Sequence, residues 1–252
     1  MLWSKRILTA LAAAAVLLCL PGQPSALSQM QSSAPATSSS SATPSPTPAA
    51  VGKPPAPEFF VLIDPGHGGD DKGAVLAPRL FEKDLTLSLA RVLRKELEER
   101  GIAARLLRDS DTTIGLERRA ELSNQQHESL YIALHAAEPG RGVHVYTALL
   151  PAPQPAVGNF LPWGTAQAAA LPRSNAMAGA VTSELQKRDV RTLNLQAFLR
   201  PLNNVVAPAI AVEVAADRAD PRSFLNPKLQ STVAAAVATG VEQNRNHFGA
   251  RK

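Results

Sequence analysis

A short apolar run that stops at a glycine-rich turn constrains this chain more than any other feature. Residues 60–63 (FVLI) are typical of a buried strand, and the Asp-Pro-Gly at 64–66 ends the strand and turns the backbone. His67 then lies at the carboxyl end of that strand, beside Gly68 and Gly69, where little side-chain bulk surrounds the imidazole. Because ligand sites in open α/β sheets lie at the carboxyl ends of strands, His67 is a candidate site residue.

Strands and helices are predicted to alternate along the rest of the chain. The apolar runs predict strands at Phe59–Ile63, Ala103–Leu107, Ser129–Leu134, Gly142–Thr147 and Pro208–Val214. The amphipathic stretches predict helices at Asp84–Arg100, Ile114–Asn124, Ser174–Lys187 and Pro227–Val241. This alternation predicts an α/β fold, a single domain whose mostly parallel central sheet carries helices on both faces.

An N-terminal extension is expected to precede the domain. Residues 1–28 resemble a signal peptide, with Lys5 and Arg6 before an apolar stretch; an uncleaved membrane anchor is the alternative. Residues 29–57, rich in Ser, Ala, Thr and Pro, predict a disordered linker. The folded domain is expected at 58–248, followed by a tail at 249–252. Either interpretation of the extension predicts an exported protein of the periplasm or cell envelope.

The charge and the cysteine content limit the partners and the means of stabilisation. The formal charge is +5, and +3 without Lys5 and Arg6, a mild excess that suits an anionic surface or polymer. This charge is too small to indicate a particular partner, and we predict no nucleic-acid partner. Cys19, the only cysteine, lies in the apolar N-terminal stretch, so the domain has no disulfide. A packed core, with or without a metal, must stabilise it.

Four ionisable residues are expected at one edge of the sheet. His67 and His135 follow the first and third strands, Glu213 ends the last apolar strand, and Glu82 opens the first helix. Two imidazoles and a carboxylate are typical ligands of a catalytic zinc ion, with a fourth position left for water. A further carboxylate can act as general base and then as general acid. These residues by themselves predict a metal hydrolase and leave its substrate open.

Each of these residues also has a purely structural interpretation. Glu82 could be a favourable charge at a helix N-terminus, and His135 a hydrogen-bonded histidine at a strand end. Glu213 is harder to explain in this way, because a carboxylate on an apolar strand is costly unless it is paired or functional.

Five motifs occur in the order found in one protein family. They are Asp64–Asp70 (DPGHGGD), Glu82–Leu85 (EKDL), Leu106–Asp111 (LLRDSD) with Leu116 and Arg119, Leu134–Ala136 (LHA), and Pro208–Glu213 (PAIAVE). The chain resembles the zinc-dependent N-acetylmuramoyl-L-alanine amidases of bacterial cell walls, of the amidase-3 type. The resemblance covers essentially the whole predicted domain.

This resemblance implies roles for the candidate residues. It implies His67, Glu82 and His135 as Zn²⁺ ligands and Glu213 as the catalytic carboxylate. The implied reaction is cleavage of the amide bond between N-acetylmuramic acid and L-alanine in peptidoglycan, in cell-wall remodelling or daughter-cell separation. Peptidoglycan is the implied partner; membrane attachment through the N-terminal segment and a protein activator are left open.

The resemblance also assigns positions around the site. Asp64 is a candidate to orient His67, or else to cap the turn. A structural ion network is expected at Arg108, Asp111 and Arg119.

Several positions depart from the family pattern. Ala137 stands where an asparagine is usual, Val214 and Ala215 replace a Gly-Phe pair, and His144 replaces an acidic or hydroxyl residue. We interpret His144 as an exposed strand residue. These departures keep two alternatives open: a catalytically weakened peptidoglycan-binding module, and a zinc peptidase that acts within the stem peptide.

A long loop at 149–172 could form part of the substrate site. It carries Phe160 and Trp163 and is rich in Pro, Ala and Gly. Long loops beside a site are often functional, so this one could wall the substrate groove. It could equally pack its own aromatic side chains on the domain surface.

Overall fold

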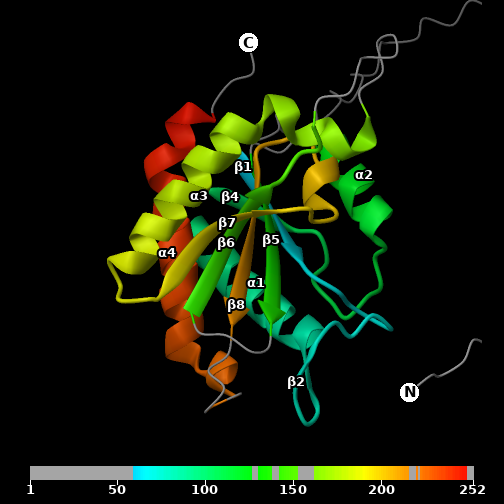
Figure 1. The fold of residues 1–252 in the computed structure, drawn as a ribbon. Helices are drawn as coiled ribbons and strands as arrows, with labels where there is room; N and C mark the ends of the chain where they lie inside the picture. Colours follow the sequence, from blue (N-terminus) through cyan, green and yellow to red (C-terminus); the bar gives the residue numbers. More distant parts are fainter. Residues whose placement is uncertain are drawn as a thin grey trace, which may run out of the picture. The chain divides into compact units, whose positions relative to one another are not determined.

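A six-stranded central sheet organises the fold (Figure 1). Across the sheet its strands are β4 (Ala103–Leu106), β1 (Phe60–Pro65), β5 (Leu130–Ala137), β8 (Ala209–Ala215), β6 (Gly142–Ala148) and β7 (Thr192–Ala197). The first four are parallel to one another, β6 is antiparallel to β8, and β7 is parallel to β6. The predicted mostly parallel sheet is therefore confirmed, with one antiparallel pair.

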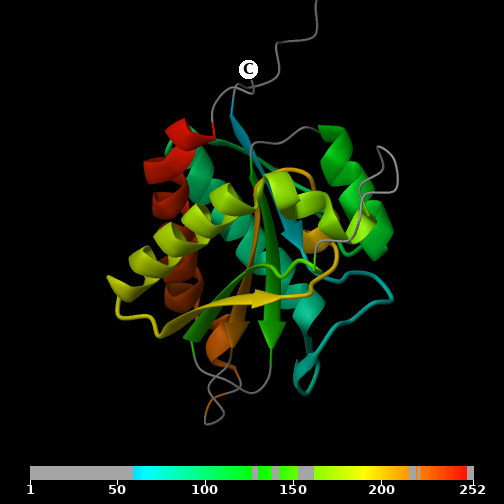
Figure 2. The ribbon, with the colours of Figure 1, turned by 45° about the horizontal axis from the view of Figure 1, so that its top comes forward.

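Helices cover both faces of this sheet, as predicted (Figures 1 and 2). One face carries α1 (Glu82–Glu99), α3 (Leu171–Gln186) and α4 (Pro227–Asn244). Above the other face lie α2 (Leu116–Gln126) and the short 3₁₀ helices η1 (Trp163–Ala169) and η2 (Leu202–Asn204). Two further 3₁₀ helices, η3 (Ser223–Leu225) and η4 (Arg245–His247), flank α4.

The apolar pattern explains why these elements form. All six residues of β1 are buried, because the strand lies between two neighbours and between two layers of helices. In α1 four of the buried leucines recur every four residues, at Leu85, Leu89, Leu93 and Leu97, on the face toward the sheet. The helix ends before Gly101, whose φ of +69° is easily adopted only by glycine.

Three strands among the described residues were not predicted. They are β7 and the two short strands of a hairpin, β2 (Val75–Ala77) and β3 (Leu80–Phe81). In β7 the side chains are mostly exposed, so no buried apolar run marks it. The helix α1 begins two residues earlier than predicted, which makes Glu82 its first residue. The predicted loop at 149–172 contains η1 and the first two residues of α3.

The computed structural model describes residues 59–126, 130–137, 142–152, 162–215, 220 and 222–248. These residues belong to one compact unit, Lys53–Lys252. The predictions for residues 1–28, 29–57 and 249–252, and for Phe160 in the long loop, lie outside the described residues. Within the described residues, no helix combines the length and the apolar character needed to span a bilayer.

Candidate metal centre

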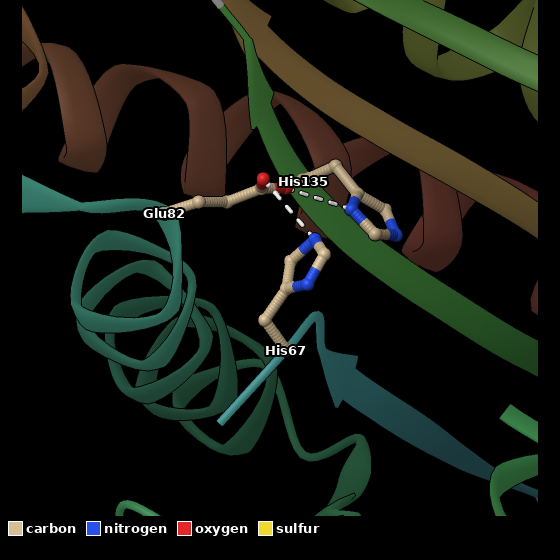
Figure 3. A group of neighbouring side chains, drawn as sticks. All are labelled: His67, Glu82 and His135. Atoms are coloured by element: carbon tan, nitrogen blue, oxygen red, sulfur yellow. Dashed lines mark hydrogen bonds and ion pairs between the residues drawn. The ribbon is translucent and has the colours of Figure 1, made fainter. Parts of the chain in front are cut away.

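Three predicted site residues from separate parts of the chain meet at the carboxyl edge of the sheet (Figure 3). His67 follows β1, Glu82 opens α1, and His135 lies in β5; one donor atom from each lies within 4.8 Å of the others. The Glu82 carboxylate lies between the two rings, with Oε2 3.1 Å from His67 Nε2 and Oε1 2.8 Å from His135 Nδ1. The rings themselves are edge-on, with centroids 5.5 Å apart.

The backbone around His67 takes conformations that bring the donors close together. His67 has φ of 60°, and the following Gly68 and Gly69 also have positive φ. A Cβ added to Gly73 would lie 2.6 Å from both Glu82 Oε2 and His67 Cδ2. A Cβ on Gly66 would lie 2.7 Å from His135 Cε1. These two glycines therefore leave the space in which the donors converge.

Asp71 orients the ring of His67. Both carboxylate oxygens of Asp71 lie 2.9 Å from His67 Nδ1, and Oδ1 also accepts a hydrogen bond of 3.1 Å from the Gly73 N–H. The other ring nitrogen, Nε2, is thereby directed at Glu82. The hypothesis that Asp64 orients His67 is wrong: Asp64 instead accepts hydrogen bonds from Arg119 and Tyr131 inside the domain.

Two buried arginines hold the backbone that carries His67, as the predicted structural network requires. Arg119 pairs with Asp64 and donates to the carbonyls of Pro65 (2.9 Å) and His67 (2.6 Å). Arg108 donates to the carbonyls of Pro65 and Gly66, both at 3.0 Å.

Asp111, the third predicted member of this network, fixes the same loop from outside. It pairs with Lys83 at 2.6 Å and accepts from the Gly69 N–H at 2.7 Å. Lys83 also donates to the Gly69 carbonyl at 2.7 Å. The turn that follows β1 and carries His67 is thus held by the side chains of Arg108, Arg119, Lys83 and Asp111.

The electrostatics favour a charged carboxylate between the two imidazoles. Burial by itself would raise the pKa of Glu82, but hydrogen bonds with His135, His67 and the Ala74 N–H hold that pKa well below its usual range. The hydrogen bond with Glu82 raises the pKa of His67, with burial opposing the rise and Asp71 adding to it. Glu82 therefore stays ionised at neutral pH, in the form that binds cations.

This donor set fits a divalent metal ion. Two imidazole nitrogens and one carboxylate oxygen are close enough to share an ion, and a second carboxylate fixes the tautomer of one imidazole. The side chain of Glu82 is 6% exposed, while those of His67 and His135 are 25% and 30% exposed. The site is therefore anchored from inside the domain and reachable from solvent.

Glu213 lies beside this centre with partners of its own. Its Cα pairs in register with that of His135 in β5 and with that of His144 in β6. Its Oε1 lies 2.9 Å from His144 Nδ1 and accepts a hydrogen bond of 3.1 Å from the Tyr146 hydroxyl. The interpretation of His144 as an exposed strand residue is wrong, since its side chain is 20% exposed and faces Glu213.

Comparison with known families agrees with this geometry. The family model described as N-acetylmuramoyl-L-alanine amidase (Amidase_3) matches residues 61–243, which include every residue of the centre. The chain belongs to this family.

Curated amidases match this chain over part of their length. The N-acetylmuramoyl-L-alanine amidase AmiA of Escherichia coli K12 is 41% identical over 76 residues, which are 30% of this chain and 26% of AmiA. The chain thus matches about a quarter of that curated relative.

Solved amidase structures share the fold. The structure of an N-acetylmuramoyl-L-alanine amidase from Clostridium difficile 630 is 25% identical, with a TM-score of 0.55 over 75% of this chain and 97% of that one. AmiC2 of Nostoc punctiforme has a TM-score of 0.56 at 24% identity, over 75% of this chain and 98% of its own.

Sequence reasoning missed two residues beside the candidate site, Asp71 and Tyr146. Asp71 could have been found as a carboxylate four residues after His67 in a glycine-rich turn. Tyr146 lies two residues after His144, so both side chains point to the same face of β6.

Proposed function

We propose that this chain is an exported zinc-dependent N-acetylmuramoyl-L-alanine amidase. Its substrate is peptidoglycan, and the bond cleaved is the amide between the lactyl group of N-acetylmuramic acid and the L-alanine of the stem peptide. The observation that carries the proposal is the convergence of His67, Glu82 and His135, with Glu213 in register beside His135. The family membership supports the choice of amide bond.

His67, Glu82 and His135 would hold the zinc ion. When bound, zinc supplies Lewis acidity, which polarises an amide carbonyl and lowers the pKa of a water molecule. Asp71 keeps the proton of His67 on Nδ1 and so leaves Nε2 as the donor nitrogen. Arg108 and Arg119 keep the loop that carries His67 in place through its carbonyl oxygens.

Glu213 acts as the general base and then as the general acid. As a carboxylate it accepts a proton from the attacking water and afterwards delivers that proton to the departing amine of L-alanine. An amine is a poor leaving group unless it is protonated, so the same carboxylate serves first as base and then as acid. Its place on the strand next to His135 supports this role.

The N-terminal sequence leads us to expect that the protein is exported. Residues 1–28 carry the features of a signal peptide or membrane anchor, and peptidoglycan lies outside the cytoplasm. The proposal therefore puts the domain in the periplasm or cell envelope.

Mass analysis of digested peptidoglycan tests the reaction. The full chain, loaded with zinc, should release intact stem peptides that start with a free L-alanine amine, and a chelator should stop the release. Shortened stems would instead identify a peptidase, and binding without any cleavage would identify a wall-binding module. Either of these two results contradicts the proposal.

Two variants separate metal binding from proton transfer. Glu213→Gln should keep zinc at wild-type stoichiometry and lose hydrolysis, because it removes only the carboxylate that takes the proton. Glu82→Gln should lose zinc and activity together, since Glu82 contacts both imidazoles. Activity retained in Glu213→Gln, or in a Glu82→Gln protein without zinc, would refute these roles.

A further inference from the structure

A row of three ionisable side chains crosses three neighbouring strands. His135, Glu213 and His144 are register partners in β5, β8 and β6. Side chains of register partners point to the same face of a sheet, here the face opposite α1, α3 and α4. His144 is therefore separated from the metal-binding histidine by Glu213 alone.

The two hydrogen bonds to Glu213 use the same oxygen. His144 Nδ1 lies 2.9 Å from Oε1, and the Tyr146 hydroxyl donates to Oε1 at 3.1 Å. Tyr146 stands in register with Ala211, two residues before Glu213 in β8, so it approaches along the strand while His144 approaches across it. Among the described residues, none makes a hydrogen bond to Oε2.

Both partners act as donors when Glu213 is ionised. A carboxylate only accepts hydrogen bonds, so the imidazole nitrogen that faces it must carry the proton. For Tyr146, burial and the nearby charge of Glu213 raise the pKa to about 12, which keeps its hydroxyl protonated at neutral pH. The His144 and Tyr146 rings also meet edge-on, with centroids 6.2 Å apart, and this contact restrains both.

We propose that His144, together with Tyr146, is a positioning residue that occupies Oε1 of Glu213 and so reserves Oε2 for proton transfer. This inference rests on the proposed amidase function. A free carboxylate rotates about its last bond and offers either oxygen, and misplacement of a reacting group by about 1 Å can reduce a rate about 100-fold. Two donors from different directions on one oxygen remove that freedom.

Isosteric variants of His144 distinguish the two ring nitrogens. In His144→Asn the amide nitrogen takes the place of Nδ1 and keeps the donor to Glu213; in His144→Gln the amide nitrogen takes the place of Nε2. We expect His144→Ala and His144→Gln to lose about 10–100-fold in kcat with little change in KM. His144→Asn should stay within about threefold of wild type, and all three should bind zinc at wild-type stoichiometry.

Tyr146→Phe provides the matched test of the second donor. It should lower kcat less than His144→Ala does, and the double variant should lose more than either single variant. A wild-type kcat in His144→Ala overturns the proposal, and so does a His144→Asn protein as slow as His144→Ala.

A measurement without catalysis separates this inference from the proposed function. In the zinc-loaded full chain, ¹⁵N NMR of the neutral His144 ring should show the proton on Nδ1, and Glu213→Gln should shift that signal. A proton on Nε2 overturns the inference even if the wild type is fully active. A wild type that leaves peptidoglycan intact, with the proton on Nδ1, refutes the amidase function and retains the contact of His144 with Glu213.

Discussion

Replacing Arg119 by methionine should destabilise the domain by about 3–4 kcal/mol at pH 7, because it leaves a buried carboxylate unpaired. Arg119 is 2% exposed and its partner Asp64 is 1% exposed. The Pro65 carbonyl would keep its hydrogen bond from Arg108, and Asp64 would keep that from Tyr131. The carbonyls of His67 and Ile114 would lose a donor, so the loss comprises these two hydrogen bonds and the positive charge beside Asp64.

The size of the effect is limited by protonation of Asp64. Burial raises the pKa of Asp64 and Arg119 opposes that rise, so removing Arg119 raises the pKa further. Protonating a carboxyl with an unfolded pKa of about 3.9 costs about 4 kcal/mol at pH 7 and about 1.4 kcal/mol less for each pH unit below that. The folded variant then binds a proton that its unfolded chain lacks, so its stability deficit should shrink from pH 7 to pH 5.

Urea unfolding of the full chain, followed by far-UV circular dichroism at both pH values, measures this deficit. Arg118→Met is the matched control on the same helix, because Arg118 is exposed and, among the described residues, pairs only with the exposed Glu121 at 3.1 Å. We expect that control to change the free energy of unfolding by less than about 0.5 kcal/mol. An Arg119→Met deficit below 1 kcal/mol, or one that grows on acidification, would contradict the reasoning.

Three further predictions concern other contacts. Asp71→Ala should weaken zinc binding about 10–100-fold in competition with a chromophoric chelator, and equal affinity would show that Asp71 does not orient His67. Gly73→Ala should also weaken zinc binding, because the new Cβ would lie 2.6 Å from Glu82 Oε2. Gly115→Ala is the control: no described residue beyond its chain neighbours has a heavy atom within 4 Å of the new Cβ, so zinc binding should not change. Lys187 and Arg188 lower the pKa of Glu184 to about 2. The wild type should thus have a larger free energy of unfolding than Glu184→Gln, with the full difference above pH 5 and a decreasing difference toward pH 2. A difference that does not depend on pH would exclude this pairing.

The sequence was informative wherever burial is nearly complete. The strands β1, β5 and β8 lie inside the sheet, so their apolar runs could be recognised, and the residues at their carboxyl ends followed from the direction of the strands. The edge strand β7 has no such signal: Leu193 is 47% exposed and its neighbours in the strand are mostly polar. Pairing with β6, rather than burial, makes this segment a strand.

The contacts around the site were less predictable because they depend on backbone geometry. Asp71 reaches His67 only because the chain turns back through positive φ at His67 and Gly69. His144 reaches Glu213 only because β6 runs antiparallel to β8 in the register that pairs these two residues. Neither the turn nor the strand order can be read from a run of residue types, so Asp71 was missed and His144 was misinterpreted.

These two kinds of contact divide the site into separable parts. The candidate metal ligands and Asp71 lie on α1, on β5 and in the loop held by Arg108 and Arg119. Among the described residues, His144 is hydrogen-bonded to Glu213 and to none of these. Within the part of the chain that the structure describes, the side chains hydrogen-bonded to Glu213 come from β6. A substitution in β6 can therefore change how the carboxylate is held while the metal centre stays the same.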